Sequence, residues 1–176
     1  MGTTFLKAEG LDVGSSAVDD DEVALAAELI TLARSGGPEL LLPVDLVVAN
    51  SFQEDAITQT VDAKDIPEGW MVMDIGPRTA ERFAAALKQS RTVLWNGTMG
   101  VFEWASFAAG TRAVANTLAA LDDATTVVGG GSTAEAVSLL GLAGRMTHVS
   151  TGGGASLEFL EDKVLPGVAA LMDKKA

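Results

Sequence analysis

The sequence of 176 residues contains no cysteine and a single histidine, His148. The absence of cysteine excludes disulfides and thiol chemistry, and the presence of only one histidine excludes a zinc site built from several histidines. Basic residues are also few, since 12 Lys and Arg stand against 24 Asp and Glu and give a net charge of −12. This charge disfavours nonspecific binding to nucleic acid. A phosphate site in such a chain needs backbone dipoles, a metal ion, or positive charge from elsewhere.

Long hydrophobic runs are missing as well. The longest, such as Leu40–Val44, are far shorter than the roughly 20 residues that cross a bilayer. The N-terminus lacks the basic-then-apolar pattern of a secretion signal. Hydrophobic residues nevertheless make up 48% of the chain, which is typical of a globular protein. We therefore expect one cytoplasmic domain with neither a membrane nor a nucleic acid as its partner.

Glycine, by contrast, is plentiful and forms two triplets. Gly129–Gly131 follow the apolar stretch Thr126–Val128, and Gly152–Gly154 follow His148–Thr151. A helical pattern comes after each triplet, so each reads as strand, glycine turn and helix. Such a turn exposes backbone N–H groups at the positive end of a helix, where phosphate binds well. The triplets predict a nucleotide or another phosphorylated ligand.

The second half of the chain repeats this pattern. We expect strands at 71–75, 92–95, 125–128 and 148–150, each followed by a glycine turn and a helix (79–89, 107–121, to about 140, and through 161). Four such units predict an α/β fold with a doubly wound parallel sheet. All four turns would lie at the carboxyl ends of the strands, where these folds bind ligands.

The first 70 residues fit this pattern less well. Helices are expected at 3–11 and 19–33, strand-like segments at 40–42 and 46–49, and an extended excursion with short strands at 51–69. An α/β domain that opens on a helix is missing its first strands. We therefore interpret the chain as a single partial domain.

Several residues that could bind a ligand or a metal also have a purely structural interpretation. The segment Gly129–Ala134 satisfies the dinucleotide pattern G-x-G-x-x-A, but no acidic residue ends the next strand, which disfavours NAD. His148 lies within an apolar strand and is interpreted as a core residue. Asp74, at a strand end, could ligate a metal or cap a turn, and capping is favoured. Trp70 and Trp95 are interpreted as core or rim packing.

The order of the motifs resembles the phosphoglycerate kinase family. The segment Leu94–Glu103 (LWNGTMGVFE) is similar to the family's Trp-Asn-Gly-Pro-Met-Gly-Val-Phe-Glu. Gly129–Ala134 is similar to its Gly-Gly-Gly-Asp-Ser/Thr turn, and His148–Leu157 to its His-Val-Ser-Thr-Gly-Gly-Gly-Ala-Ser-Leu stretch. Matches in the same order also occur at 4–7, 40–45 and 74–77.

This resemblance implies the C-terminal, nucleotide-binding domain of a two-domain glycolytic kinase. The family moves a phosphoryl group between 1,3-bisphosphoglycerate and Mg-ADP, so Mg and ATP or ADP are the implied cofactors. The N-terminal domain, which binds phosphoglycerate through basic residues, is the implied missing partner. The isolated chain is then not expected to turn over.

The resemblance also implies roles for individual residues. Glu103 would hold the ribose hydroxyls, and Asn96 would lie near the nucleotide phosphates. Gly130, Gly131 and Thr133 would form the phosphate turn. The catalytic role falls to Gly152, Gly153 and Gly154, whose N–H groups would face the transferring phosphoryl group. No residue of the chain is assigned as a metal ligand.

Three departures from the family pattern fall at or beside the implied pocket. Ser132 stands where the family has an aspartate that interacts with the metal–nucleotide. Thr98 replaces a proline, and Val72 replaces a glycine beside the adenine pocket. A hydroxyl cannot supply a carboxylate's charge near Mg²⁺. These departures favour the alternative hypothesis, a catalytically silent α/β scaffold of the same fold.

Overall fold

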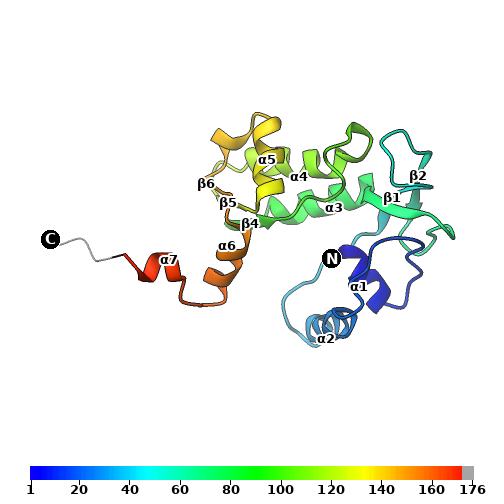
Figure 1. Cartoon of the computed structure of the whole chain (residues 1–176), viewed down its shortest axis with the longest axis horizontal. Helices are drawn as coiled ribbons and strands as arrows, with labels where there is room; N and C mark the ends of the chain where they lie inside the picture. The colour runs from blue at the N-terminus through cyan, green and yellow to red at the C-terminus, as the bar shows by residue number, and fades with distance from the viewer. Residues whose placement is uncertain (172–176) are drawn as a thin grey trace. The chain divides into compact units, whose positions relative to one another are not determined.

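The computed structural model (Figure 1) describes residues 1–171. These residues form two compact units. Unit 1 contains Met1–Gln89 and Met99–Thr117. Unit 2 contains Ser90–Thr98 and the chain from Leu118. Each unit has its own three-stranded sheet, and the two sheets differ in strand direction.

Unit 1 begins with two helices that pack on each other, α1 (Gly2–Ala8) and α2 (Val23–Arg34). The buried residues of α2 are Ala26 and Ile30, one helical turn apart, as an amphipathic pattern requires. The acidic run 19–22 comes directly before α2, where negative charge favours a helix start. Both expected helices are therefore confirmed, with slightly shifted ends.

Sheet A of unit 1 has β1 (Asp45–Ala49) at its centre. β2 (Thr58–Asp62) and β3 (Met71–Ile75) flank it, and both run antiparallel to β1. Unit 1 also contains α3 (Pro77–Leu87), the 3₁₀ turn η1 (Ala105–Phe107) and most of α4 (Ala109–Ala119). Two apolar clusters form its core, one made of Leu6, Val13, Leu46, Val48, Ala63 and Ile66, the other of Ala49, Met73 and Phe107.

The structure corrects two expectations in this part of the chain. The strand at 71–75 was expected in the parallel sheet, but it is β3 of the antiparallel sheet A. No helix occurs in the described residues 50–70 to make the crossover that parallel pairing requires. The segment 40–42 is not a strand, because Pro43 interrupts the chain before β1.

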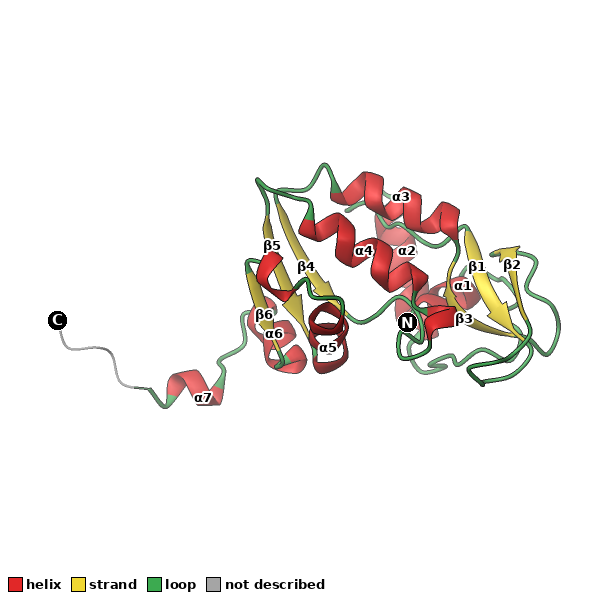
Figure 2. Ribbon diagram, turned by 90° about the horizontal axis from the view of Figure 1, so that it is seen from above, coloured by secondary structure: helices red, strands yellow, loops and turns green. Residues whose placement is uncertain are grey.

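Unit 2 contains the parallel sheet that the sequence predicts. β4 (Thr92–Asn96), β5 (Thr125–Gly129) and β6 (His148–Ser150) lie side by side in that order (Figure 2). The helices and turns that follow are α5 (Gly131–Leu139), η2 (Ala143–Arg145), α6 (Gly153–Leu160) and α7 (Pro166–Ala169). Three of the four expected strand–glycine–helix units therefore share one sheet edge.

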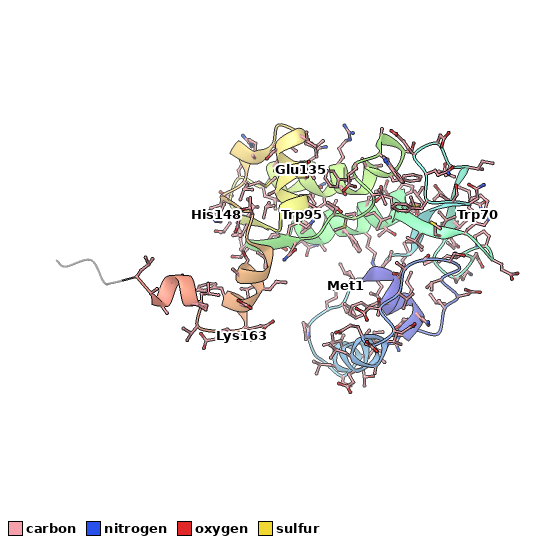
Figure 3. All side chains as sticks on the ribbon, in the orientation of Figure 1. Met1, Trp70, Trp95, Glu135, His148 and Lys163 are labelled. Atoms are coloured by element: carbon pink, nitrogen blue, oxygen red, sulfur yellow. The ribbon has the colours of Figure 1, made fainter. Side chains whose placement is uncertain are left out.

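The two faces of this sheet differ. Val93 and Trp95 on β4 and Thr126 and Val128 on β5 are buried, together with apolar residues of α5. The opposite face bounds a groove of about 450 Å³, lined by sheet residues and by α6. His148 lines this groove and is exposed, so its interpretation as a core residue is wrong (Figure 3). Within residues 1–171, no helix has the length and apolar character needed to cross a bilayer.

Candidate functional site

The carboxyl edge of the parallel sheet brings the two glycine triplets together. Asn96, the last residue of β4, pairs in register with Gly129 at the end of β5. Gly129 in turn pairs with Ser150 at the end of β6. Each strand leads directly into its turn, so the residues expected to contact phosphate leave the sheet as neighbours. The spatial clustering of Asn96 with both triplets follows from this register.

The two triplets approach so closely that side chains could not fit between them. A Cβ on Gly153 would lie 2.8 Å from the Cα of Gly130 and 3.1 Å from its nitrogen. A Cβ on Gly130 would lie 3.0 Å from Oδ1 of Asn96, and Gly130 has a φ of +96°, which side chains rarely adopt. Glycine is therefore required at both positions for backbone to meet backbone.

Several N–H groups at this edge have no acceptor. The first turn of α5 contributes those of Gly131, Ser132 and Thr133, and the first turn of α6 those of Gly153 and Gly154. Within residues 1–171 none of these groups donates a hydrogen bond, as is usual for a helix start. Both helices direct their positive dipole ends to this edge, so an anion would be stabilised there.

Gly152 differs from the other two glycines of its triplet. Its N–H donates to Oγ of Ser150 at 3.2 Å, and its carbonyl accepts from Oγ of Ser156 at 2.9 Å. The N–H of Gly152 that was predicted to face the transferring phosphoryl group is therefore already used in an internal hydrogen bond. Sequence reasoning missed this pair of serines, although small hydroxyl residues beside both ends of a glycine turn often bond to its backbone.

The side chain of Thr133 also makes a structural contact that the sequence did not predict. Its side chain is 1% exposed, and its Oγ1 accepts a 2.8 Å hydrogen bond from the N–H of Gly97. The indole Nε1 of Trp95 donates to the carbonyl of Gly97 at 2.8 Å. The turn that follows β4 is thus held at both polar groups of Gly97, and Asn96 is fixed with it.

The residues at this edge suit phosphate better than they suit a metal ion. The contact between Gly130 and Gly153 and the free N–H groups form a cradle for anionic oxygens. Ser132, in the first turn of α5, is exposed and carries no charge. Among the described residues no three His, Asp or Glu side chains gather where they could hold a metal. Within residues 1–171, this edge therefore offers backbone N–H groups to an anion rather than a cluster of side chains to Mg²⁺.

Two further predicted residues, Glu103 and Val72, lie in unit 1. Glu103 is exposed and has no hydrogen-bond partner within residues 1–171, so its carboxylate is available to a ligand. Val72 is half-buried on β3 and packs against the cluster around Leu6 and Val48. Its N–H donates to Oγ of Ser16 at 2.9 Å.

The sequence interpretation favoured Asp74 as a cap for the turn after its strand, but its carboxylate caps the start of α4. Its Oδ2 accepts a 2.8 Å hydrogen bond from the N–H of Gly110 in the first turn of α4, and its Oδ1 accepts from its neighbour Ile75 at 2.8 Å. Burial raises the pKa of Asp74 to about 6, although these backbone hydrogen bonds act to lower it.

Asp45, the other buried carboxylate of sheet A, behaves in the opposite way. Burial acts to raise its pKa, but the net pKa is lowered by hydrogen bonds from Thr79 and Arg78. The hydroxyl and N–H of Thr79 both donate to Oδ1 at 2.7 Å, and the N–H of Arg78 donates to Oδ2 at 3.1 Å. These contacts place Asp45 at the start of α3, in the structural part of unit 1.

Comparison with known sequences is consistent with these features. The phosphoglycerate kinase family matches residues 1–163. The chain is 57% identical over 175 residues to a phosphoglycerate kinase of Chloroflexus aurantiacus, a match that covers 98% of this chain and 44% of that protein. It is 56% identical over 174 residues to one of Moorella thermoacetica, with 99% and 44% covered. The chain thus spans less than half the length of these relatives.

Comparison with solved structures agrees. The phosphoglycerate kinase of Coxiella burnetii superposes with a TM-score of 0.89 at 38% identity, covering 96% of this chain and 43% of that one. The enzyme of Pyrococcus horikoshii OT3 gives a TM-score of 0.78 at 31% identity, covering 97% and 42%. The expected α/β fold class and the resemblance seen in the motifs are both confirmed, and the chain belongs to the phosphoglycerate kinase family.

Proposed function

We propose that this chain is the nucleotide-binding part of a phosphoglycerate kinase. It takes Mg-ADP or Mg-ATP and serves phosphoryl transfer to and from 1,3-bisphosphoglycerate in the cytoplasm. The observation that carries the proposal is the convergence of Asn96, Gly130 and Gly153 at one edge of a parallel sheet. Anionic oxygens fit there because two helix starts supply unpaired N–H groups.

The proposed roles are assigned residue by residue. In unit 2, Gly130, Gly131 and Thr133 bind nucleotide phosphates through backbone N–H groups, and Asn96 lies beside them. Gly153 and Gly154 face the transferring phosphoryl group, with Gly152 supporting their turn. Glu103 holds the ribose hydroxyls. Phosphoryl transfer then depends on positioning and on stabilising the developing charge.

Mg²⁺ enters this proposal bound to the nucleotide. Ser132 offers only a hydroxyl where the family has an aspartate, so the metal would be held by phosphate oxygens rather than by the chain. Losing one preorganised electrostatic contact commonly costs about 10²–10³ in rate. Affinity for Mg-ADP is therefore expected to be weakened by Ser132.

The remaining substrate requires a partner. A net charge of −12 leaves this chain poorly suited to bind phosphoglycerate by itself. We propose that the N-terminal domain of the same enzyme type supplies the basic half of the active site and that the 176 residues act as one partial nucleotide-binding domain. Domain closure would then bring the two substrates together.

Two measurements test the proposal. Titration calorimetry with Mg-ADP should give a dissociation constant between micromolar and sub-millimolar, and no detectable heat would refute a working pocket. A coupled kinase assay should show no turnover by the chain alone and turnover when it is mixed with an N-terminal domain of a relative. Turnover by the chain alone would contradict the need for a partner.

A catalytically silent scaffold is the second candidate, favoured by Val72, Thr98 and Ser132. Restoring the family residues with Val72→Gly, Thr98→Pro and Ser132→Asp distinguishes the two. If Mg-ADP binds only after restoration, this chain is a degenerate module. Val72 complicates the test because it packs against the unit 1 core, so Thr98→Pro with Ser132→Asp should also be examined without Val72→Gly.

A further inference from the structure

Asp74 is a buried carboxylate enclosed by two glycines of unit 1. Its side chain is 1% exposed. A Cβ on Gly100 would lie 2.6 Å from Cγ of Asp74, and a Cβ on Gly110 would lie 2.4 Å from its Oδ1. Gly100 and Gly110 therefore leave space for the carboxylate that no other residue type would leave. The arrangement joins the end of β3 to two segments distant in sequence.

One of these segments is the loop that carries Glu103. The N–H of Val101 donates to the carbonyl of Met73 at 3.0 Å, which ties the loop to the residue before Asp74. The N–H groups of Phe102 and Trp104 then donate to the carbonyls of Gly100 and Val101, at 2.9 and 3.1 Å. Glu103 is thus presented by a tight turn whose base, Gly100, rests on the Asp74 carboxylate.

The other segment is the first turn of α4. The N–H of Gly110 donates to Asp74, and Thr111, the next residue, accepts through Oγ1 a 3.0 Å hydrogen bond from the N–H of Met99. The helix start and the loop are therefore fastened to each other as well as to β3. Asp74 lies where all three meet.

We propose that Asp74 is a positioning residue for nucleotide binding: it fixes the loop of residues 99–104 and so sets where Glu103 meets the ribose. This role rests on the proposed nucleotide function of Glu103. None of the sequence patterns suggested it, because the glycines that enclose Asp74 lie 26 and 36 positions further along the chain.

The ionised carboxylate is the form that holds this arrangement. It accepts hydrogen bonds from backbone N–H groups of Ile75, Ala109 and Gly110, and a protonated carboxyl would turn one acceptor oxygen into a donor. The other titratable or charged groups on these packed elements are Asp45 on β1, which bonds Thr79, and the exposed Arg112 and Glu103. The loop should therefore loosen as Asp74 takes up a proton.

The first test needs no nucleotide. Amide NMR of the wild-type chain between pH 5 and 7.5 should show the signals of Gly110, Val101 and Glu103 moving together with a midpoint near the Asp74 pKa of about 6. The same signals should stay constant in Asp74→Asn. Asp45→Asn serves as the matched control, because it removes the other buried carboxylate of sheet A and should leave this titration intact.

The second test asks whether the loop matters for the ribose. Wild type should bind Mg-ADP about tenfold more tightly than it binds the 2′,3′-dideoxy analogue of ADP, because the analogue has no ribose hydroxyl to donate a hydrogen bond to Glu103. Asp74→Asn should reduce that ratio to about twofold, as should Glu103→Gln. Asp45→Asn should retain it, even if its overall stability falls.

The outcomes separate the two proposals. Amide signals in the loop that do not respond to pH or to Asp74→Asn would overturn the positioning role. A loop that responds while the ratio between ADP and its analogue is unchanged would overturn the link to Glu103. If no nucleotide binds to any form, the proposed function fails in this chain, and the amide titration still decides whether Asp74 positions the loop.

Discussion

Glycine serves opposite purposes in the two units. In unit 1 it makes space for buried charge: Gly76 lies against the Asp45 carboxylate, and Gly100 and Gly110 lie against Asp74. In unit 2 it lets backbone meet backbone, because Gly153 lies against Gly130. The first arrangement is closed and fully hydrogen-bonded, whereas the second leaves N–H groups open at an edge.

This difference shows where glycine indicates a ligand and where it indicates packing. A glycine against a carboxylate that already has donors serves the fold, since nothing is left for a ligand to satisfy. A glycine against another turn, with unpaired donors beside it, leaves room for an anion. Substitution by alanine should therefore reduce folding stability in unit 1 and ligand binding in unit 2.

The largest effect is expected from Gly110→Ala. The new methyl group would lie 2.4 Å from Asp74 Oδ1 and from Ile75 Cγ1, so the carboxylate must move away from its donors. Overpacking and loss of a buried charged hydrogen bond together should lower the free energy of unfolding by about 3 kcal/mol or more. Urea unfolding measures the change. Gly2→Ala, where nothing lies within 4 Å, is the control and should change stability little.

The two buried carboxylates should give opposite pH dependences of stability. The pKa of Asp74 is raised from 3.8 to about 6. Its stabilising contribution to the free energy of unfolding is therefore complete below about pH 3.8 and is lost as the pH rises through 6. Protonation relieves the cost of the buried charge, even though it weakens the local hydrogen bonds. The pKa of Asp45 is lowered, so its contribution is present above pH 3.8 and is lost as pH falls through its folded value.

Unfolding free energies measured from pH 3 to 7.5 test this contrast. Relative to Asp74→Asn, wild type should lose on the order of 2 kcal/mol between pH 4 and 7. Relative to Asp45→Asn, wild type should gain stability as the pH rises over the acidic range. If both differences in unfolding free energy changed with pH in the same direction, the opposite pKa shifts assigned to Asp74 and Asp45 would be contradicted.

The sequence predicted unit 2 better than unit 1, for a physical reason. β5 and β6 pass directly into a glycine turn and a helix, and β4 passes into a glycine turn that leads through η1 to α4, so local pattern and parallel pairing agree. β3 has the same local pattern but pairs antiparallel with β1, because that choice depends on the helix-free connection 50–70 rather than on β3 itself. Local patterns do not specify which strands become neighbours.

Features of the candidate site likewise differ in whether local sequence patterns predict them. The gathering of Asn96 with both triplets could be predicted because register follows from strand ends. The hydrogen bond from Gly97 to Thr133 and the enclosure of Asp74 could not, since each joins residues 36 positions apart through tertiary packing. His148 was wrongly assigned to the core because its place within an apolar strand does not say which face of the sheet a helix covers.

A smaller effect on stability is expected from Gly153→Ala, which tests the open edge of unit 2. The methyl group would lie 2.8 Å from Gly130 Cα, so the two turns must separate at a cost of about 1–2 kcal/mol. Mg-ADP affinity should fall at least about tenfold, because the N–H groups of the two turns no longer converge. Calorimetry and thermal unfolding together measure both changes.

Gly154→Ala is the matched control for that substitution. It changes the next residue of the same helix, and nothing lies within 4 Å of its added methyl group. Alanine in α6 should raise stability by about 0.5 kcal/mol or slightly more and leave Mg-ADP affinity unchanged. Equal losses of affinity in both variants would show that the close contact between Gly153 and Gly130 is not what organises the edge.

The smallest change in stability, with a gain in binding, is expected from Ser132→Asp. A carboxylate in the first turn of α5 interacts favourably with the helix dipole, by about 0.3–1 kcal/mol, partly offset by repulsion from Glu135 one turn later. The same charge restores a partner for nucleotide-bound Mg²⁺, so affinity for Mg-ADP should rise about tenfold while affinity for metal-free ADP falls. Ser132→Asn has similar size without the charge and should change neither affinity. If Ser132→Asp and Ser132→Asn behave alike, the open edge binds phosphate through its backbone alone, and the charge missing from this turn is not what limits it.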